Sequence, residues 1–107
     1  MASYYKNAKV DLTSTDITTL YTAPAATTAV FKSILVADDS GSTSTITVTL
    51  TDSASAVFIL FSVKATVASA TVELLTQPLV VQESEILKVT AANANRLHVV
   101  GSYLEIT

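Results

Sequence analysis

The strict alternation between Thr43 and Thr51 constrains the fold of this chain more than any other feature. Every second residue in this stretch is threonine, and the residues between them include Ile46, Val48 and Leu50. Successive side chains of an extended strand point to opposite faces. The segment therefore predicts a β-strand with its aliphatic side chains on a core and a ladder of threonines on the opposite face.

The rest of the chain also has the character of strands separated by turns. Val, Ile and Thr, which favour strands, dominate these segments. We expect about eight strands, near residues 8–12, 18–22, 27–37, 43–51, 56–64, 66–75, 85–91 and 96–106, with a short apolar piece at 79–81. This spacing is typical of an all-β domain, either an antiparallel β-sandwich or a jelly-roll-like barrel.

Three local expectations accompany this pattern. Residues 1–6 are expected to form a short N-terminal arm in front of a single β-sandwich domain that covers residues 1–107. The strands between residues 27 and 64 are expected to be consecutive and antiparallel. Residues 83–91 also fit a helical period of 3.6, so that segment remains open between strand and helix.

Composition points to surfaces that are covered by protein. Half of the 107 residues are hydrophobic and only 14% are charged, against roughly 25% in an average domain. The mean hydropathy is +0.50. A domain of this size has little interior in which to bury that apolar excess, so we expect part of it to be buried against partners.

Charge and sequence bias argue against several classes of function. The six Lys and Arg residues are scattered and the net charge is −3, so we expect no nucleic-acid partner.

The absence of cysteine excludes disulfides and thiolate metal sites. We expect no signal peptide in residues 1–9 and no membrane partner, because the longest apolar run, residues 56–61, falls short of the roughly 20 residues that span a bilayer. We expect synthesis in the host cytoplasm.

We expect no enzyme, no catalytic residue and no cofactor. His98 is the only histidine, and no nucleophile elbow or Gly-rich oxyanion turn accompanies it. It lies in an alternating strand, which favours a structural or interface role. Glu83 and Glu85 flank a turn, where carboxylates are usually solvated.

We also expect no metal site. Asp38, Asp39 and Ser42 offer hard oxygen ligands, but the longer ligand series and the closing glutamate of a calcium loop are missing. A turn between two strands explains these residues better.

The candidate interface lies in the most apolar strand. Residues 56–64 are apolar on both predicted faces, and Phe58 and Leu60 form the second face together with Phe31 of an earlier strand. This face either completes the core of a two-sheet sandwich or forms the centre of an oligomer. Apart from Asp52, no charge lies between Thr51 and Lys64, which fits an interface core.

Two tyrosines near the N-terminus, Tyr4 and Tyr5, are candidate anchors of the arm on a neighbouring subunit. The threonine face of residues 43–51 is either a solvated outer face or a flat surface that binds an ordered partner or a glycan.

Three segments resemble small virion structural proteins of tailed bacteriophages, particularly phages of cyanobacteria and other aquatic bacteria. They are Thr19-Leu20-Tyr21-Thr22-Ala23-Pro24, Ser44-Thr45-Ile46-Thr47-Val48-Thr49-Leu50-Thr51-Asp52, and residues 83–106 with Ile86-Leu87-Lys88-Val89-Thr90-Ala91. The likeness extends over most of the chain as a style of sequence, rich in Thr and Ala and without cysteine. It brings no set of functional residues with it.

The resemblance implies a β-domain that stabilises or decorates a capsid as a cement protein, commonly as a trimer at capsid symmetry axes. We expect a homo-oligomer, with the trimer favoured, whose other partner is the major capsid protein or another virion protein. The expected location is the virion. The alternatives are a neck, tail or baseplate component, or a carbohydrate- or receptor-binding module on a virion fibre.

Overall fold

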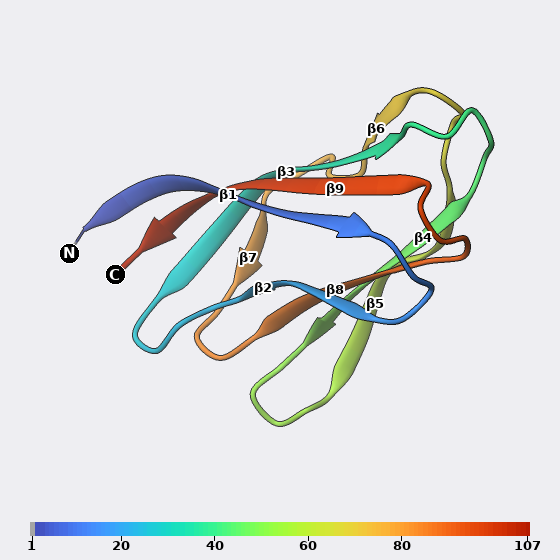
Figure 1. The fold of residues 1–107 in the computed structure, drawn as a ribbon. Helices are drawn as coiled ribbons and strands as arrows, with labels where there is room; N and C mark the ends of the chain where they lie inside the picture. The colour runs from blue at the N-terminus through green and yellow to red at the C-terminus, as the bar shows by residue number, and fades with distance from the viewer. Residues whose placement is uncertain (1) are drawn as a thin grey trace.

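The computed structural model describes residues 2–107 as two antiparallel β-sheets packed face to face (Figure 1). Sheet A contains β1 (Ser3–Leu12), β9 (Leu97–Ile106) and β3 (Thr28–Asp38) in that order, and β3 then pairs with both β6 (Thr71–Glu73) and β7 (Leu79–Val81). Sheet B has the order β2 (Thr18–Thr22), β8 (Ile86–Ala91), β4 (Thr45–Thr51) and β5 (Val57–Ala65). Residues 2–107 contain no helix, and so none that could cross a membrane. The all-β sandwich predicted from the sequence is confirmed, with nine strands.

The core lies between the sheets and follows the period-two patterns. Ile46 and Val48 of β4 are fully buried, as are Leu97 and Val99 of β9 in the facing sheet. The intervening threonines of β4 pair with the outward-facing positions of β8, for example Thr47 with Thr90. Residues 45–49 follow the predicted division between core and threonine face, but Thr51 is buried, so the threonine face does not extend to the end of β4.

The connection after β3 differs from the expectation of consecutive antiparallel strands. β3 belongs to sheet A and β4 to sheet B, so the chain crosses between the sheets here, and only β4 and β5 form a hairpin. Buried Asp38 holds the crossing turn, because its carboxylate accepts hydrogen bonds from the amide and hydroxyl of Ser40 and from the hydroxyl of Thr66. Burial alone would raise the pKa of Asp38, but these hydrogen bonds outweigh it and hold the pKa below its usual value. The carboxylate has a structural role in the turn.

The N-terminal residues also differ from the expected arm. Residues 3–6 belong to β1, which pairs with β9 along its whole length, and Met1 lies outside the described residues. The backbone of Ala2 exchanges two hydrogen bonds with Thr107, so the two ends of the chain lie side by side (Figure 1). The sequence concealed this strand because side chains 3–7 are all exposed and show no alternation. The segment left open between strand and helix is a strand, β8, from Ile86 onward.

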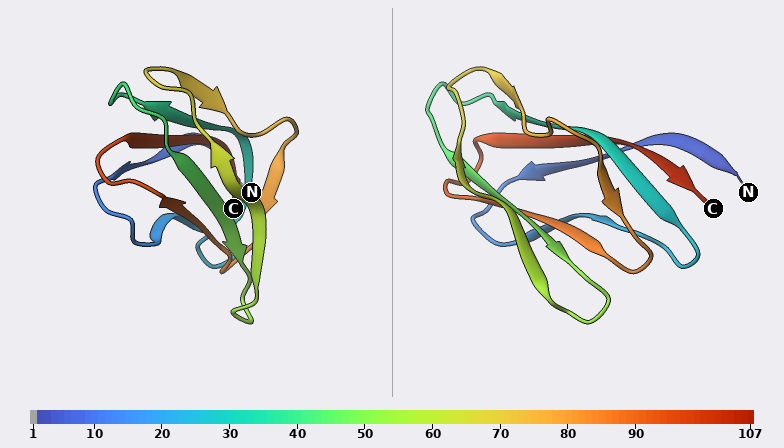
Figure 2. Two further views of the ribbon diagram at one scale, coloured as in Figure 1. Left: turned by 90° about the vertical axis from the view of Figure 1, so that its right-hand side faces the viewer. Right: turned by 180° about the vertical axis from the view of Figure 1, so that it is seen from behind.

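The two lateral sides of the sandwich are unlike each other. On one side β1 and β2 approach and make contacts between the sheets. On the other side the β4–β5 hairpin extends away from sheet A, as all three views show (Figures 1 and 2). This projection places one strand of sheet B beyond the cover that the opposite sheet supplies.

Candidate functional site

The largest group of exposed apolar side chains on one strand lies along β5. Val57, Phe58, Ile59 and Val63, together called the β5 strip, have exposed fractions between 54% and 64%. β5 is an edge strand, since it pairs with β4 on one side and with no strand of the described chain on the other. The strip therefore combines apolar side chains with an unpaired backbone.

A bulge explains why the side chains of β5 do not alternate regularly between a buried face and an exposed face. Val48 pairs with Phe61 and Thr49 with Ile59, so Leu60 is an extra residue on β5. The bulge breaks the alternation, and both Leu60 and Phe61 pack against the core as partly buried residues. Residues 57–59 form the regular part of the edge in front of the bulge.

The hydrogen-bond pattern of the hairpin shows which backbone groups face outward. The amide of Asp52 donates to the carbonyl of Ala56 at 2.9 Å, so this pair is a hydrogen-bonded pair of the ladder. Because such pairs alternate in an antiparallel ladder, Phe58 is hydrogen-bonded to Leu50. The amides and carbonyls of Val57 and Ile59 consequently point to the free edge.

No charged side chain protects this edge. The segment from residue 53 to residue 63 contains no Asp, Glu, Lys, Arg or His and no Pro. Natural edge strands usually carry charges or proline, because a bare apolar edge is a template for pairing with another chain. An uncharged stretch of high β-propensity also has the composition of segments that form cross-β stacks. A strand of this kind is a candidate site for pairing with another chain.

The structure separates the predicted interface residues into three groups. Phe31 is completely buried and stacks on Tyr103 with ring centroids 4.7 Å apart, so it belongs to the core and not to a surface. Leu60 is half-buried against the core, whereas Phe58 is 54% exposed. Phe31 and Leu60 thus join the core between the two sheets, which is one of the two alternatives expected from the sequence, whereas Phe58 is mainly exposed.

Tyr4 and Tyr5 are both exposed, and Tyr5 belongs to a second apolar surface that the sequence did not reveal. Tyr5 pairs with Leu104, Leu104 with Val30, and Val30 with Val80, so one side chain from each of four strands follows the next across sheet A. We call this set the Tyr5 row. Tyr5 and Val80 at its ends are 78% and 48% exposed. The row depends on strand register, which no local sequence pattern contains.

The one buried carboxylate of β9, Glu105, is fully engaged inside the protein. Its Oε2 accepts a hydrogen bond from the Tyr21 hydroxyl at 2.7 Å, and its Oε1 lies 2.8 Å from Lys6 Nζ. The bonds from Lys6 and Tyr21 lower the pKa of Glu105, and Glu105 in turn raises the pKa of Lys6. Burial and then the bond to Glu105 raise the pKa of Tyr21 well above its usual value. These charges fasten β1 and β2 to β9.

His98 lies on the outer face of sheet A between two carboxylates. Its Nε2 is 3.2 Å from Asp11 Oδ1, and its Nδ1 is 3.8 Å from Asp39 Oδ2. None of the hydrogen bonds among residues 2–107 joins His98 to a serine hydroxyl. No group of three or more His, Cys, Asp or Glu side chains in this part of the chain is arranged to hold a metal ion. The geometry is that of a surface imidazole in contact with two aspartates, about half-exposed to solvent.

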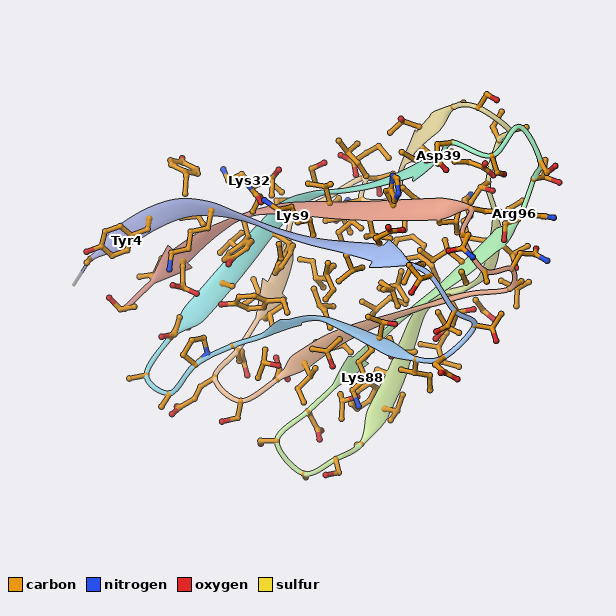
Figure 3. The ribbon with its side chains drawn as sticks, viewed as in Figure 1. Tyr4, Lys9, Lys32, Asp39, Lys88 and Arg96 are labelled. Atoms are coloured by element: carbon orange, nitrogen blue, oxygen red, sulfur yellow. The ribbon has the colours of Figure 1, made fainter. Side chains whose placement is uncertain are left out.

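The labelled charged residues lie outside β5. Lys9 is on β1, Lys32 on β3 and Lys88 on β8, while Asp39 and Arg96 lie in the turns after β3 and before β9 (Figure 3). Lys88 lies in the same row of sheet B as the strip, because it pairs with Thr49, which in turn pairs with Ile59. The strongest candidate for function is the uncharged apolar edge of sheet B, as an interaction surface.

In comparisons with known proteins, no family model, no curated protein and no solved structure matches this chain.

Proposed function

We propose that this chain is a virion structural protein that works by packing against other protein subunits and not by catalysis. The observation that carries the proposal is the β5 strip, an uncharged apolar edge strand with its backbone unpaired. Burial of such a surface contributes about 25 cal/mol per Å² before the costs of ordering are subtracted.

The distribution of apolar surface favours a subunit with two different neighbours. The β5 strip lies at the edge of sheet B, whereas the Tyr5 row lies on the outer face of sheet A. A subunit that joins a second copy through one surface and a lattice through the other gains avidity from the repetition of the lattice. This arrangement suits a capsid decoration or cement protein.

The proposed location on a phage particle rests on the resemblance of three segments to small virion proteins of tailed bacteriophages. Within that class, the two apolar surfaces of a single sandwich favour a decoration protein that lies on the capsid. The major capsid protein is the proposed lattice partner, and the Tyr5 row is its proposed contact.

The test is quantitative mass spectrometry of purified particles produced by the genome that encodes this chain. We expect the chain to be present in many copies per particle and to be labelled on the head by immunogold electron microscopy. Particles that lack the chain after purification would refute the virion role. Labelling confined to the tail would refute the decoration role and support a tail component.

A further inference from the structure

We propose that the partner of the β5 strip is the β5 strand of a second copy of this chain, paired antiparallel about a two-fold axis at Phe58. This inference rests on the proposed assembly role, and it identifies the partner that the β5 strip contacts in that role. The two copies would join their four-stranded sheets into one continuous sheet. Such an isologous contact is closed, because each copy presents the same patch to the other.

The backbone of β5 is suited to this register. Val57 and Ile59 point their amides and carbonyls to the free edge, while Phe58 between them is bonded to β4. In antiparallel pairing, Val57 of one copy opposes Ile59 of the other, and both residues present free groups to each other. Each of the two symmetric pairs exchanges two hydrogen bonds, and Phe58 meets its own copy in the non-hydrogen-bonded position.

The side chains also match in this register. Directly paired residues share a face, so Val57 packs beside Ile59 of the second copy on the outer face of the sheet. The two Phe58 rings meet on the inner face of the projecting β4–β5 hairpin (Figure 2), and in the single chain Phe58 is 54% exposed. The non-hydrogen-bonded position brings the two Phe58 Cα atoms to about 4.5 Å, which favours contact between the rings.

Symmetry selects the antiparallel orientation. A two-fold axis perpendicular to the sheet relates the two edge strands in opposite directions, so each copy presents the same residues to the other. Charge does not contribute, because Asp52 belongs to the turn before β5, where its Oδ1 accepts hydrogen bonds from the amides of Ala54 and Ala56.

The bulge limits the pairing to a defined segment. Beyond Ile59, the extra residue Leu60 and the left-handed conformation of Val63, with φ of 49°, turn the strand away from a regular ladder. A partner strand therefore has residues 57–59 as its regular template, centred on Phe58, and a shifted register would lose these hydrogen bonds.

Site-directed disulfide formation tests this geometry, because the natural chain contains no cysteine. In the Phe58→Cys variant, two cysteines meet across the proposed axis at a separation that suits a disulfide. We expect mild oxidation to convert most of this variant to a covalent dimer. The matched control is Val63→Cys, at a position on the same strand that is 64% exposed, against 54% for Phe58, but that lies far from its own copy in antiparallel pairing. We expect at least tenfold less dimer from the control at the same concentration.

A dimer of the Val63→Cys variant that forms as readily as that of Phe58→Cys would overturn the proposed register. Amide hydrogen exchange of the unsubstituted chain gives a second measurement that requires no variant. We expect the amides of Val57 and Ile59 to be protected at high protein concentration and to lose protection on dilution. Fast exchange of both amides at every concentration would refute the pairing. That result would leave the proposed virion role untouched, because the virion role is tested separately by the presence of the chain in particles.

Discussion

The edge strands β1 and β5 show two opposite ways of ending a sheet. β1, at one edge of sheet A, has Lys6, Lys9 and Asp11 among its ten residues. β5, at one edge of sheet B, has no charge before Lys64 near its end. Charges on an edge strand oppose pairing with another chain, so β1 is protected and β5 is not. This difference makes β5 the candidate edge for the proposed contact.

The surroundings of the two edges support the same distinction. β1 contacts β2 across the sandwich, and Lys6 joins it to buried Glu105 of β9. β5 belongs to a hairpin that projects beyond sheet A and leaves Phe58 half-exposed (Figure 1). One lateral side of the molecule is complete within a single chain, whereas the other lacks a neighbour.

The largest difference between the two sides is expected from the two phenylalanines. Phe31→Ala removes a fully buried ring, and we expect it to lower the free energy of unfolding by about 3–5 kcal/mol. Phe58→Ala removes a half-exposed ring, and we expect a loss below about 1 kcal/mol at concentrations where the chain is monomeric. Urea denaturation of both variants measures the two losses. Equal losses would mean that Phe58 is part of the core.

A smaller effect is expected at Gly101, on the complete side of the molecule. A Cβ atom at this position would lie 2.6 Å from Cε2 of Phe31. Gly101→Ala therefore forces the ring to move, and we expect a loss of about 1–3 kcal/mol in urea denaturation. The control is Ser102→Ala, because Ser102 is exposed on the opposite face of β9. A control as destabilised as Gly101→Ala would contradict the close packing of this ring.

Acid tests the anchoring of the protected edge. The pKa of Glu105 is lower in the folded chain than its ordinary value of 4.5. The stabilisation from this carboxylate is therefore complete above about pH 4.5 and is lost as the pH falls through the folded pKa. We expect thermal melts of the natural chain to show a falling midpoint below this pH, and Glu105→Gln to lose part of that dependence. The remainder is expected from Asp38, whose pKa is also lowered. An identical pH profile for Glu105→Gln would contradict the ion-pair account.

The smallest effect on folding is expected from a charge on the β5 strip. Ile59 and Ile17 are 63% and 70% exposed, so Ile59→Lys and Ile17→Lys should each change monomer stability by less than about 0.5 kcal/mol. Only Ile59→Lys places a charge on the proposed contact, and we expect it alone to abolish association in sedimentation velocity. If both variants lose association, or if neither does, the association does not occur through the β5 strip.

The sequence predicted strands well where one face of the strand packs on the core and the other face is exposed to solvent. The alternation of Thr43–Thr51 determined both the strand and its faces, because burial on one side imposes a period of two. It could not distinguish Phe31 from Phe58, since both lie in apolar strands and only the sheet arrangement decides which is covered. The bulge at Leu60 also made the five-residue apolar run at 57–61 look like a strand buried on both faces.

Other features required three-dimensional register or a crossing between sheets. The strand at residues 3–6 lacks alternation because its side chains are all exposed, and its partners in β9, residues 103–106, lie 97 to 103 positions further along the chain. The Tyr5 row brings together four strands through pairings that no local pattern encodes. The turn at residues 38–42 was recognised, but its local residues do not specify that the chain changes sheets there.

Self-association through β5 is tested by the solution mass of the unsubstituted chain, measured by size exclusion with light scattering over a dilution series. We expect a species of twice the 11.2-kDa chain mass that dissociates toward the monomer on dilution. A mass of 11.2 kDa at every concentration would contradict self-association through β5. A stable species of three times the chain mass would contradict the two-fold contact and support the trimer that the resemblance implies.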